Sequence, residues 1–219
     1  MPRKPKPPPP TQARSRETLQ RMLDAAEAVL EKHGIEGATL QRIARNARLA
    51  PATVYRRFPD KDALMAAVFE RFAGVSKEEL ARPIDTEAIR KLGIHAFTAL
   101  WIGNMIQGFR ARTGLIRASV LYSQAHLNSA FVRRKMALEI QGVKRVQDLF
   151  LLWRDEIGHP DAEQAVAFAM VMVALALREL ILFNHAPMFG QVTPLDDEAL
   201  RRELPRMFLG YLGVDRKIP

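Results

Sequence analysis

The chain has 219 residues, carries 33 Lys and Arg against 24 Asp and Glu for a net charge of +9, and contains no cysteine. The lack of cysteine excludes disulfides, thiolate metal ligands and cysteine nucleophiles, and it favours a cytoplasmic protein. The basic excess is uneven, because residues 1–72 hold 14 Lys and Arg against 8 Asp and Glu. This imbalance favours a polyanionic partner for that part of the chain. The length is sufficient for two domains.

Residues 1–15 contain six prolines, at positions 2, 5 and 7 to 10, together with four basic residues. Such a composition cannot build a packed core, so we expect a disordered basic arm. The arm lacks the apolar region of a signal peptide. Two interpretations stay open for it: a solubilising tail, or an arm that follows DNA phosphates or enters a minor groove.

A helix is predicted over residues 16–33, because apolar residues recur on one stripe and Gly34 follows as a stop signal. Two short helices come next. The first has Thr39 as its N-cap, and the second begins at Pro51 and repeats Val54 and Phe58 four residues apart. The apolar positions of the first short helix are Leu40, Ile43, Ala44 and Ala47. Asp60 is then expected to cap a helix that runs to about residue 80 and links the two domains.

At 100° per residue, the second short helix directs Ala52, Thr53 and Arg56 away from the face that carries Val54. A small residue, a hydroxyl and an arginine suit the major groove, where arginine pairs with guanine and methyl groups contact thymine. Arg56 is the strongest candidate for a base contact. The remaining candidates lie at helix edges, where they would meet phosphates.

The stretch from about Arg16 to Phe72 resembles the DNA-binding domain of the TetR/AcrR family of bacterial transcriptional regulators. The resemblance rests on residues at the family's spacing: Gly34, Gly37, Thr39, Ile43, Ala44, Ala47, Thr53, Val54, Tyr55, Phe58, Lys61 and Leu64. It implies backbone-phosphate contacts for Thr39, Tyr55 and Lys61. It implies base or groove contacts for Gln41, Pro51, Ala52, Thr53, Arg56 and Arg57.

Three positions depart from the family's common pattern. Arg48 stands where the turn usually has glycine, so Arg48 is expected to take a conformation that glycine accepts more easily. Ala50 stands where a serine usually caps the second helix, a loss of about 1 kcal/mol that Pro51 partly offsets. Ala52 stands where glycine is frequent. These departures affect the start of the recognition helix and leave the fold expectation unchanged.

Helical stripes dominate the rest of the chain, at about residues 86–110, 114–126, 129–157, 161–185 and 196–212. The expected fold is therefore all-α. A helix-turn-helix domain at 16–72 precedes a larger helical domain for ligand binding and dimerisation at 73–219. Pro205 is expected to kink or split the last helix.

Residues 165–177 are thirteen apolar residues without a charge, too few for a membrane span of about 20. A buried helix is expected, and its second apolar side predicts a homodimer. The family resemblance implies dimerisation through the helices at about 161–185 and 196–212, which would present two recognition helices to a near-palindromic double-stranded operator.

Aromatic and methionine residues in the second domain recur at helical spacing, a pattern that ordinary core burial also explains. The resemblance favours a pocket for a hydrophobic or aromatic small molecule. The candidate lining residues are Phe97, Trp101, Asn104, Met105, Tyr122, His126, Phe150 and Trp153.

No motif indicates catalysis, a metal site or a bound cofactor, because the five histidines are scattered and no nucleotide-binding or hydrolase signature occurs. The sequence predicts a cytoplasmic DNA-binding regulator, and the family resemblance implies a repressor that a ligand releases from DNA. Two alternatives remain: an activator or ligand-independent DNA-architectural protein, and a helical small-ligand carrier or interaction module without specific DNA binding.

Overall fold

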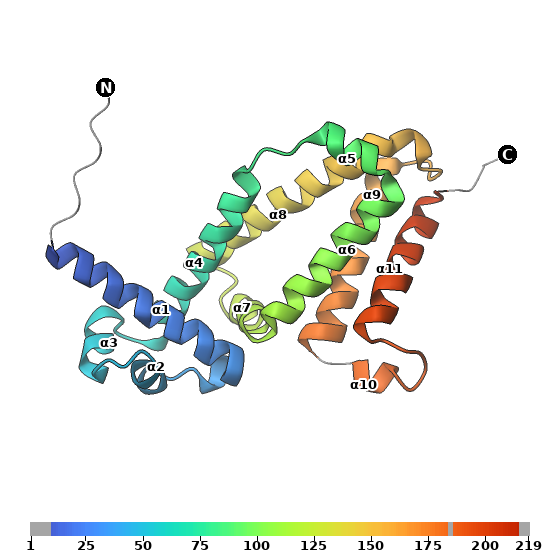
Figure 1. Ribbon diagram of the computed structural model, residues 1–219. Helices are drawn as coiled ribbons and strands as arrows, with labels where there is room; N and C mark the ends of the chain where they lie inside the picture. Colours follow the sequence, from blue (N-terminus) through green and yellow to red (C-terminus); the bar gives the residue numbers. More distant parts are fainter. Residues whose placement is uncertain (1–9, 184–185, 215–219) are drawn as a thin grey trace, which may run out of the picture.

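The computed structural model describes residues 10–183 and 186–214, and every regular element in these ranges is a helix. The expected all-α fold is confirmed. Figure 1 shows a small group of helices at the amino-terminal end and a larger group of long helices beside it. We call the first group the head and the second the body.

The head is built from α1 (Pro10–Gly37), α2 (Leu40–Asn46), α3 (Pro51–Arg57) and the first half of α4 (Lys61–Ala81). α1 begins six residues earlier than the predicted helix, and residues 1–9 of the predicted arm lie outside the described residues. Gly34 interrupts α1 with a φ of 64°, where the sequence predicted its end. Asp60 accepts the backbone N–H of Ala63, so the predicted cap of α4 is present.

The body contains α5 (Thr86–Leu92), α6 (Ile94–Ala111), α7 (Thr113–Ala125) and α8 (Ala130–Phe150). The single helix expected at 86–110 is wrong in one respect, because Gly93 has a φ of 83° and divides it into α5 and α6. The predicted helix at 129–157 is α-helical to Phe150 and continues as the 3₁₀ turn η1 (Leu151–Glu156). Ser129 caps α8 by accepting the N–H of Val132.

The body ends with α9 (Ala162–Leu177), the π-helical turn η2 (Arg178–Leu182), the short α10 (Ala186–Phe189) and α11 (Asp197–Leu212). Of the two expected effects of Pro205, a kink or a split of the last helix, the split is wrong, because α11 is continuous through this proline. Buried Leu204 and Phe208 flank this proline, and packing against α6 and α9 holds a helix that has lost one hydrogen bond.

Two hydrophobic cores hold the molecule together. The core of the head contains buried residues from α1 to α4, and it also contains Leu115, Ala118 and Tyr122 of α7. The second core joins α6, α8, α9 and α11. α7 is therefore part of the head's core although it lies far from the head in sequence.

α9 and η2 together form a stretch, Ala162–Leu182, whose hydropathy of 2.2 and length of 21 residues would allow it to cross a membrane by those criteria alone. Core helices of soluble proteins meet the same criteria. This stretch packs against α6, α8 and α11, and the fully buried side chains of Val166, Val173 and Leu177 fill the second core. The placement agrees with the predicted buried helix.

Candidate nucleic-acid interface

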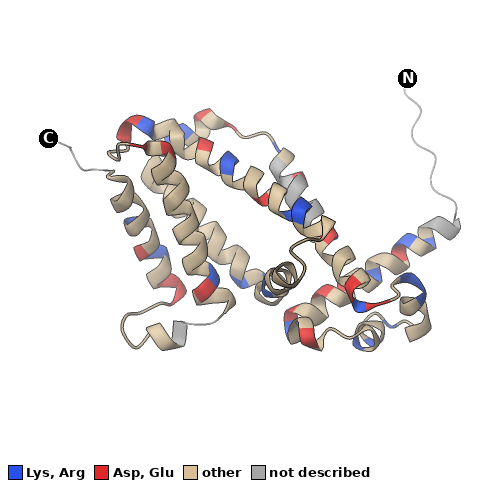
Figure 2. Cartoon of the chain, turned by 180° about the vertical axis from the view of Figure 1, so that it is seen from behind, with Lys and Arg blue, Asp and Glu red and all other residues tan. Residues whose placement is uncertain are grey.

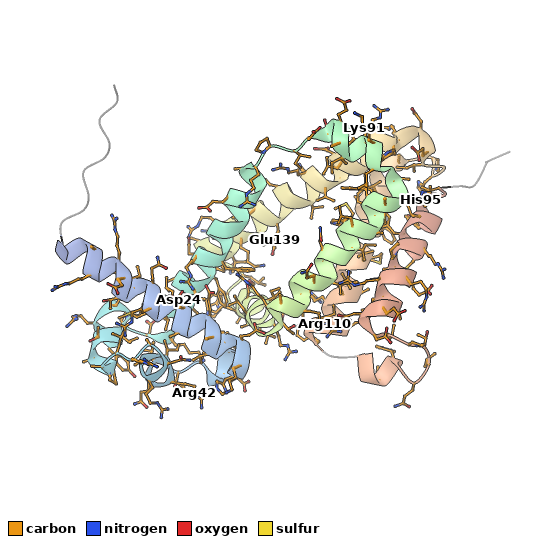
Figure 3. The ribbon with its side chains drawn as sticks, viewed as in Figure 1. Asp24, Arg42, Lys91, His95, Arg110 and Glu139 are labelled. Atoms are coloured by element: carbon orange, nitrogen blue, oxygen red, sulfur yellow. The ribbon has the colours of Figure 1, made fainter. Side chains whose placement is uncertain are left out.

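Thr39 begins the helix-turn-helix. Its side chain accepts the N–H of Arg42 at 3.2 Å, which is the predicted N-cap of α2. The inner face of α2 is buried through Ile43 and Ala44. Arg42 donates to the carbonyl of Gly37 at 2.8 Å and so ties α2 to the end of α1. Figure 3 labels Arg42 on the outer edge of the head.

The turn between α2 and α3 contains Arg48 at a φ of 54°, which is the conformation that the sequence predicted for this position. A left-handed conformation is unfavourable for a residue with a side chain. Arg21 of α1 compensates, because its guanidinium donates to the carbonyl of Ala47 at 2.7 Å and to that of Arg48 at 3.4 Å. Sequence reasoning missed Arg21, since only the tertiary fold brings it to the turn.

α3 has Ala50 at its N-cap without a side-chain hydrogen bond, as expected, and Pro51 at its first turn. Val54 and Phe58 are buried and fix the helix against the head's core. The outward side therefore presents exposed Pro51, Ala52, Tyr55, Arg56 and Arg57, with Thr53 half-buried. Gln41 of α2 is also exposed. Among the described residues, neither Arg56 nor Arg57 has an ion-pair partner.

Lys61, an expected phosphate ligand, is half-buried and donates its ammonium group to the carbonyl of Ile35. It thereby closes the α1–α2 connection against the start of α4. Tyr55 and Thr39, the other two expected phosphate ligands, are exposed. Figure 2 shows basic residues on α1, α2 and α3, the elements that carry these side chains.

The first turns of α1 add a wall that carries Arg14, a residue of the predicted basic arm for which a DNA-contacting role stayed open. Arg14 and Thr18 line a groove of about 360 Å³ together with Thr53, Arg56 and Arg57 of α3. The signal lay in Arg14 itself, which the sequence analysis included in the basic arm. Because α1 begins at Pro10, this arginine is held on a helix beside α3.

Residues 22–68, which contain this helix-turn-helix, match the family model for bacterial regulatory proteins of the tetR family. The amino-terminal domain belongs to the TetR family. Over 76 residues the chain is 37% identical to an uncharacterized HTH-type transcriptional regulator of Mycobacterium bovis and to one of the same description from Mycobacterium tuberculosis. The alignment covers 34% of this chain, and the chain spans 40% of the length of these relatives.

Two solved structures share the fold of nearly the whole chain. A transcriptional regulator from Rhodococcus sp. Rha1 has a TM-score of 0.63 at 18% identity, covering 92% of this chain and 99% of that one. A TetR transcription regulator from Haloarcula marismortui has a TM-score of 0.62 at 18% identity, covering 90% and 97%. The similarity of the body to TetR-family structures is thus one of fold. The relatives and structures named here are described as transcriptional regulators, and none of these descriptions names an enzyme.

The expected pocket residues do not line one common cavity. Phe97, Phe150 and Trp153 are buried, and the Phe97 and Phe150 rings pack edge to face at 4.9 Å. Trp101 and Met105 pack against the same second core, whereas Asn104 is exposed. Tyr122 lies in the core of the head and His126 lies beside it, and the centroids of their stacked rings are 4.0 Å apart. The cavities of the body are lined by other residues.

Burial raises the pKa of the Tyr122 phenol, and the negative charges of Asp62 and Asp60 raise it further. Both carboxylates belong to the start of α4 and the loop before it. His126 also lies 3.9 Å from Asp62. These contacts join the carboxyl end of α7 to the junction between α3 and α4.

An apolar cavity with a volume of about 470 Å³ lies between α8 and the segment from α4 to Ile84. A second cavity of about 420 Å³ lies between α7, α8 and α9. Both are lined by Phe72, Ser119, Lys135 and Glu139. Small-molecule pockets commonly have volumes of about 300–1,000 Å³, so either cavity could hold an effector.

The outer face of α9 and α11 is apolar. Phe168, Val171 and Leu175 of α9 recur at helical spacing and are 40–49% exposed, and Met207 and Tyr211 of α11 are 48% and 43% exposed. The Phe168 and Tyr211 rings are 5.4 Å apart, so the two helices share one surface. We call these five residues the α9–α11 face. In Figure 2 the middle of α9 carries no charge.

Proposed function

We propose that this TetR-family protein is a transcriptional regulator that binds an operator in double-stranded DNA as a homodimer. One observation carries the proposal: the outward side of α3 combines exposed Ala52, Arg56 and Arg57, and neither arginine has an ion-pair partner among the described residues. Buried Val54 and Phe58 set the direction of that side. Free arginines on a rigid helix can pair with guanine without first losing a protein partner.

In this proposal the head uses two kinds of contact. Base or groove contacts come from Gln41, Pro51, Ala52, Thr53, Arg56 and Arg57. Contacts that hold the phosphate backbone come from Thr39, Tyr55 and Lys61. The Lys61 ammonium already donates to the carbonyl of Ile35. Because an ammonium has three donors, Lys61 can bind a phosphate while it keeps that bond, or it can release Ile35 and bind the phosphate in its place.

The proposed dimer forms through the α9–α11 face. Five large apolar side chains that are about half exposed on one surface are unfavourable in water, and a second copy related by a two-fold axis would cover them with the same residues. Such an axis presents two α3 helices to successive major grooves, about 34 Å apart in general, and so predicts a near-palindromic site.

Ligand control is proposed to pass through α7. The buried face of this helix supplies Leu115, Ala118 and Tyr122 to the core of the head, and Ser119 on the same face lines both cavities. At its start, Glu31 of α1 accepts the N–H groups of Gly114 and Leu115. A molecule that binds one position of α7 better than another would therefore change the spacing of the heads and the operator affinity. From the sequence, α4 was expected to link the two domains, and α7 adds a second connection.

The test is selection of bound fragments from random and genomic duplex DNA with the full chain, at two salt concentrations. Recovery of one near-palindromic sequence that survives the higher salt supports the proposal. Recovery of fragments without a consensus, bound only at low salt, would identify a general phosphate binder instead. No retention of DNA at either salt would favour the alternative of a ligand carrier.

A further inference from the structure

We propose that the effector is an elongated carboxylic acid with an apolar body and a hydroxyl or similar oxygen group at its far end. The inference rests on the proposed function, because it takes the cavity between α4 and α8 as the effector site. In that cavity, apolar walls, cations that have no carboxylate partner among the described residues and an unsatisfied hydroxyl meet.

The body of the ligand is set by the walls. Most of the lining side chains are apolar and come from α4, the segment after it, and α8: Phe69, Phe72, Pro83, Ile84, Phe131, Leu138, Val146 and Leu149. A polar molecule would lose its hydration against such walls without recovering hydrogen bonds. A long apolar chain, in contrast, is stabilised in proportion to the area it buries.

The charge of the ligand follows from the charged residues that line the cavity. Among the described residues of the lining, Arg82, Lys135 and Arg145 supply three cations against the one carboxylate of Glu139. Lys135 is already paired with Glu139 at 2.5 Å. Arg82 and Arg145 have no carboxylate partner among the described residues, and the Arg145 guanidinium donates only to the carbonyl of Arg82. A carboxylate would complete this end with charge-assisted hydrogen bonds.

The far end is defined by Ser119. Its side chain is 2% exposed, it lines the cavity, and its hydroxyl oxygen has no hydrogen-bond partner. Buried hydroxyls normally have partners, and an unsatisfied one at a cavity wall points to a missing ligand atom. Ser119 lies near Lys135 and Glu139, because these three residues line both cavities. Figure 3 labels Glu139 on α8.

The two ends set the length of the ligand. Lys135, beside Ser119, and Arg145, at the cationic end, are ten residues apart on α8, or about 15 Å at 1.5 Å per residue. A ten-carbon chain that carries a carboxylate at one end and a hydroxyl at the other spans a comparable length. The matched probes are therefore decanoate, 10-hydroxydecanoate and decyltrimethylammonium, all below their micelle concentrations.

Titration calorimetry of the full chain without DNA tests the ligand class. We expect decanoate to bind at least about tenfold more tightly than decyltrimethylammonium, because only the carboxylate pairs with Arg82 and Arg145. Arg145→Met should weaken decanoate binding about tenfold. Lys144→Met, at the exposed neighbour on α8 that does not line the cavity, should leave it unchanged. Equal binding of the cationic and anionic probes, or equal effects of the two variants, would overturn the assignment.

The role of Ser119 is tested by comparing the affinities of the protein for two acids, one with and one without a terminal hydroxyl. We expect 10-hydroxydecanoate to bind about two- to tenfold more tightly than decanoate, and Ser119→Ala to abolish that difference. The same variant should not lower the thermal midpoint of the free protein, because it removes a hydroxyl without partners. If the hydroxy acid has no advantage, or Ser119→Ala weakens both acids equally, the far-end assignment is wrong.

Operator binding by the same preparation separates this inference from the proposed function. Selection of a specific DNA site together with a failure of the acids to bind would overturn the ligand class and leave the regulator. Binding of the acids without any selected DNA site would support the ligand class and overturn the proposed DNA-binding function.

Discussion

Glu31 and Gly114 join the head to the body at the start of α7. The Glu31 carboxylate accepts the N–H groups of Gly114 and Leu115, each at 2.9 Å. The backbones also touch, because a Cβ added to Gly114 would lie 2.3 Å from the Glu31 carbonyl oxygen. Two N–H groups that α7 cannot satisfy itself are thus satisfied by a side chain of α1, and the contact permits only glycine.

Gly114→Ala is expected to destabilise the protein by about 1–3 kcal/mol, because the new methyl group meets backbone that cannot rotate away. α1 and α7 must separate to accept it, so operator affinity should fall as well. Chemical denaturation and fluorescence anisotropy with labelled operator measure the two effects. The matched control is Gly108→Ala in α6, where no atom lies within 4 Å of the new Cβ and helix propensity predicts a gain of up to about 1 kcal/mol. Similar effects of both variants would contradict the close contact.

Arg48→Gly is expected to stabilise the free protein by about 1 kcal/mol, because the φ of 54° at this position costs glycine little. Urea denaturation gives the change in the free energy of unfolding. Arg45→Gly, three residues earlier inside α2, should instead destabilise by about 1 kcal/mol. A loss of stability in both variants would mean that Arg48 contributes more through its side chain than its backbone conformation costs.

The local features of the head could be predicted from the sequence because short-range rules determine them. Thr39 as a cap, Ala50 without one, and Arg48 at positive φ depend on residue type and position within a few residues. The buried stripe of α1 depends only on helical periodicity. The sequence missed the division at Gly93, because a glycine inside an apolar helical pattern is equally compatible with a continuous helix.

The cavity could not be predicted, because it depends on how α4, α7 and α8 cross. The positions of Lys135, Glu139 and Arg145 on α8 fit a solvated helix face, and only the neighbouring helices convert them into a cavity wall. The aromatic pattern that suggested a pocket belongs to residues such as Phe97 and Phe150, which pack against each other. Aromatic spacing alone does not distinguish a filled core from an empty site.

Arg56→Ala is expected to cost about 1–3 kcal/mol of operator affinity and to relax the preference at one base position. The guanidinium is exposed on the outward side of α3, where only base edges or phosphates can use it. Anisotropy with the selected operator and with single-base variants measures both effects. Arg133→Ala, at an exposed arginine of the body, serves as the control. A uniform loss of affinity for all DNA sequences would mean that Arg56 contacts a phosphate and not a base.

Arg14→Ala is expected to weaken binding to all sequences equally and to reduce the slope of log affinity against log salt by about 1. The reason is that Arg14 lies on the groove wall beside Arg56 and Arg57, where we expect it to contact DNA phosphates and not base edges. The control is Lys91→Ala in α5, which removes one charge from the body, distant from the head in Figure 3. An unchanged salt slope for Arg14→Ala would exclude the first turns of α1 from the interface.

Phe168→Arg is expected to convert the dimer into a monomer, because the charge would lie at the centre of the α9–α11 face. Light scattering after gel filtration measures the mass, and circular dichroism checks that the fold is kept. Ile140→Arg in α8 is the matched control, since Ile140 is 54% exposed but lies outside that face. The monomeric variant should also bind the operator much more weakly, because two separate monomers must then bind the two half-sites of the operator independently. A dimeric mass for Phe168→Arg, or a monomeric mass for the unmodified chain, would contradict an interface at the α9–α11 face.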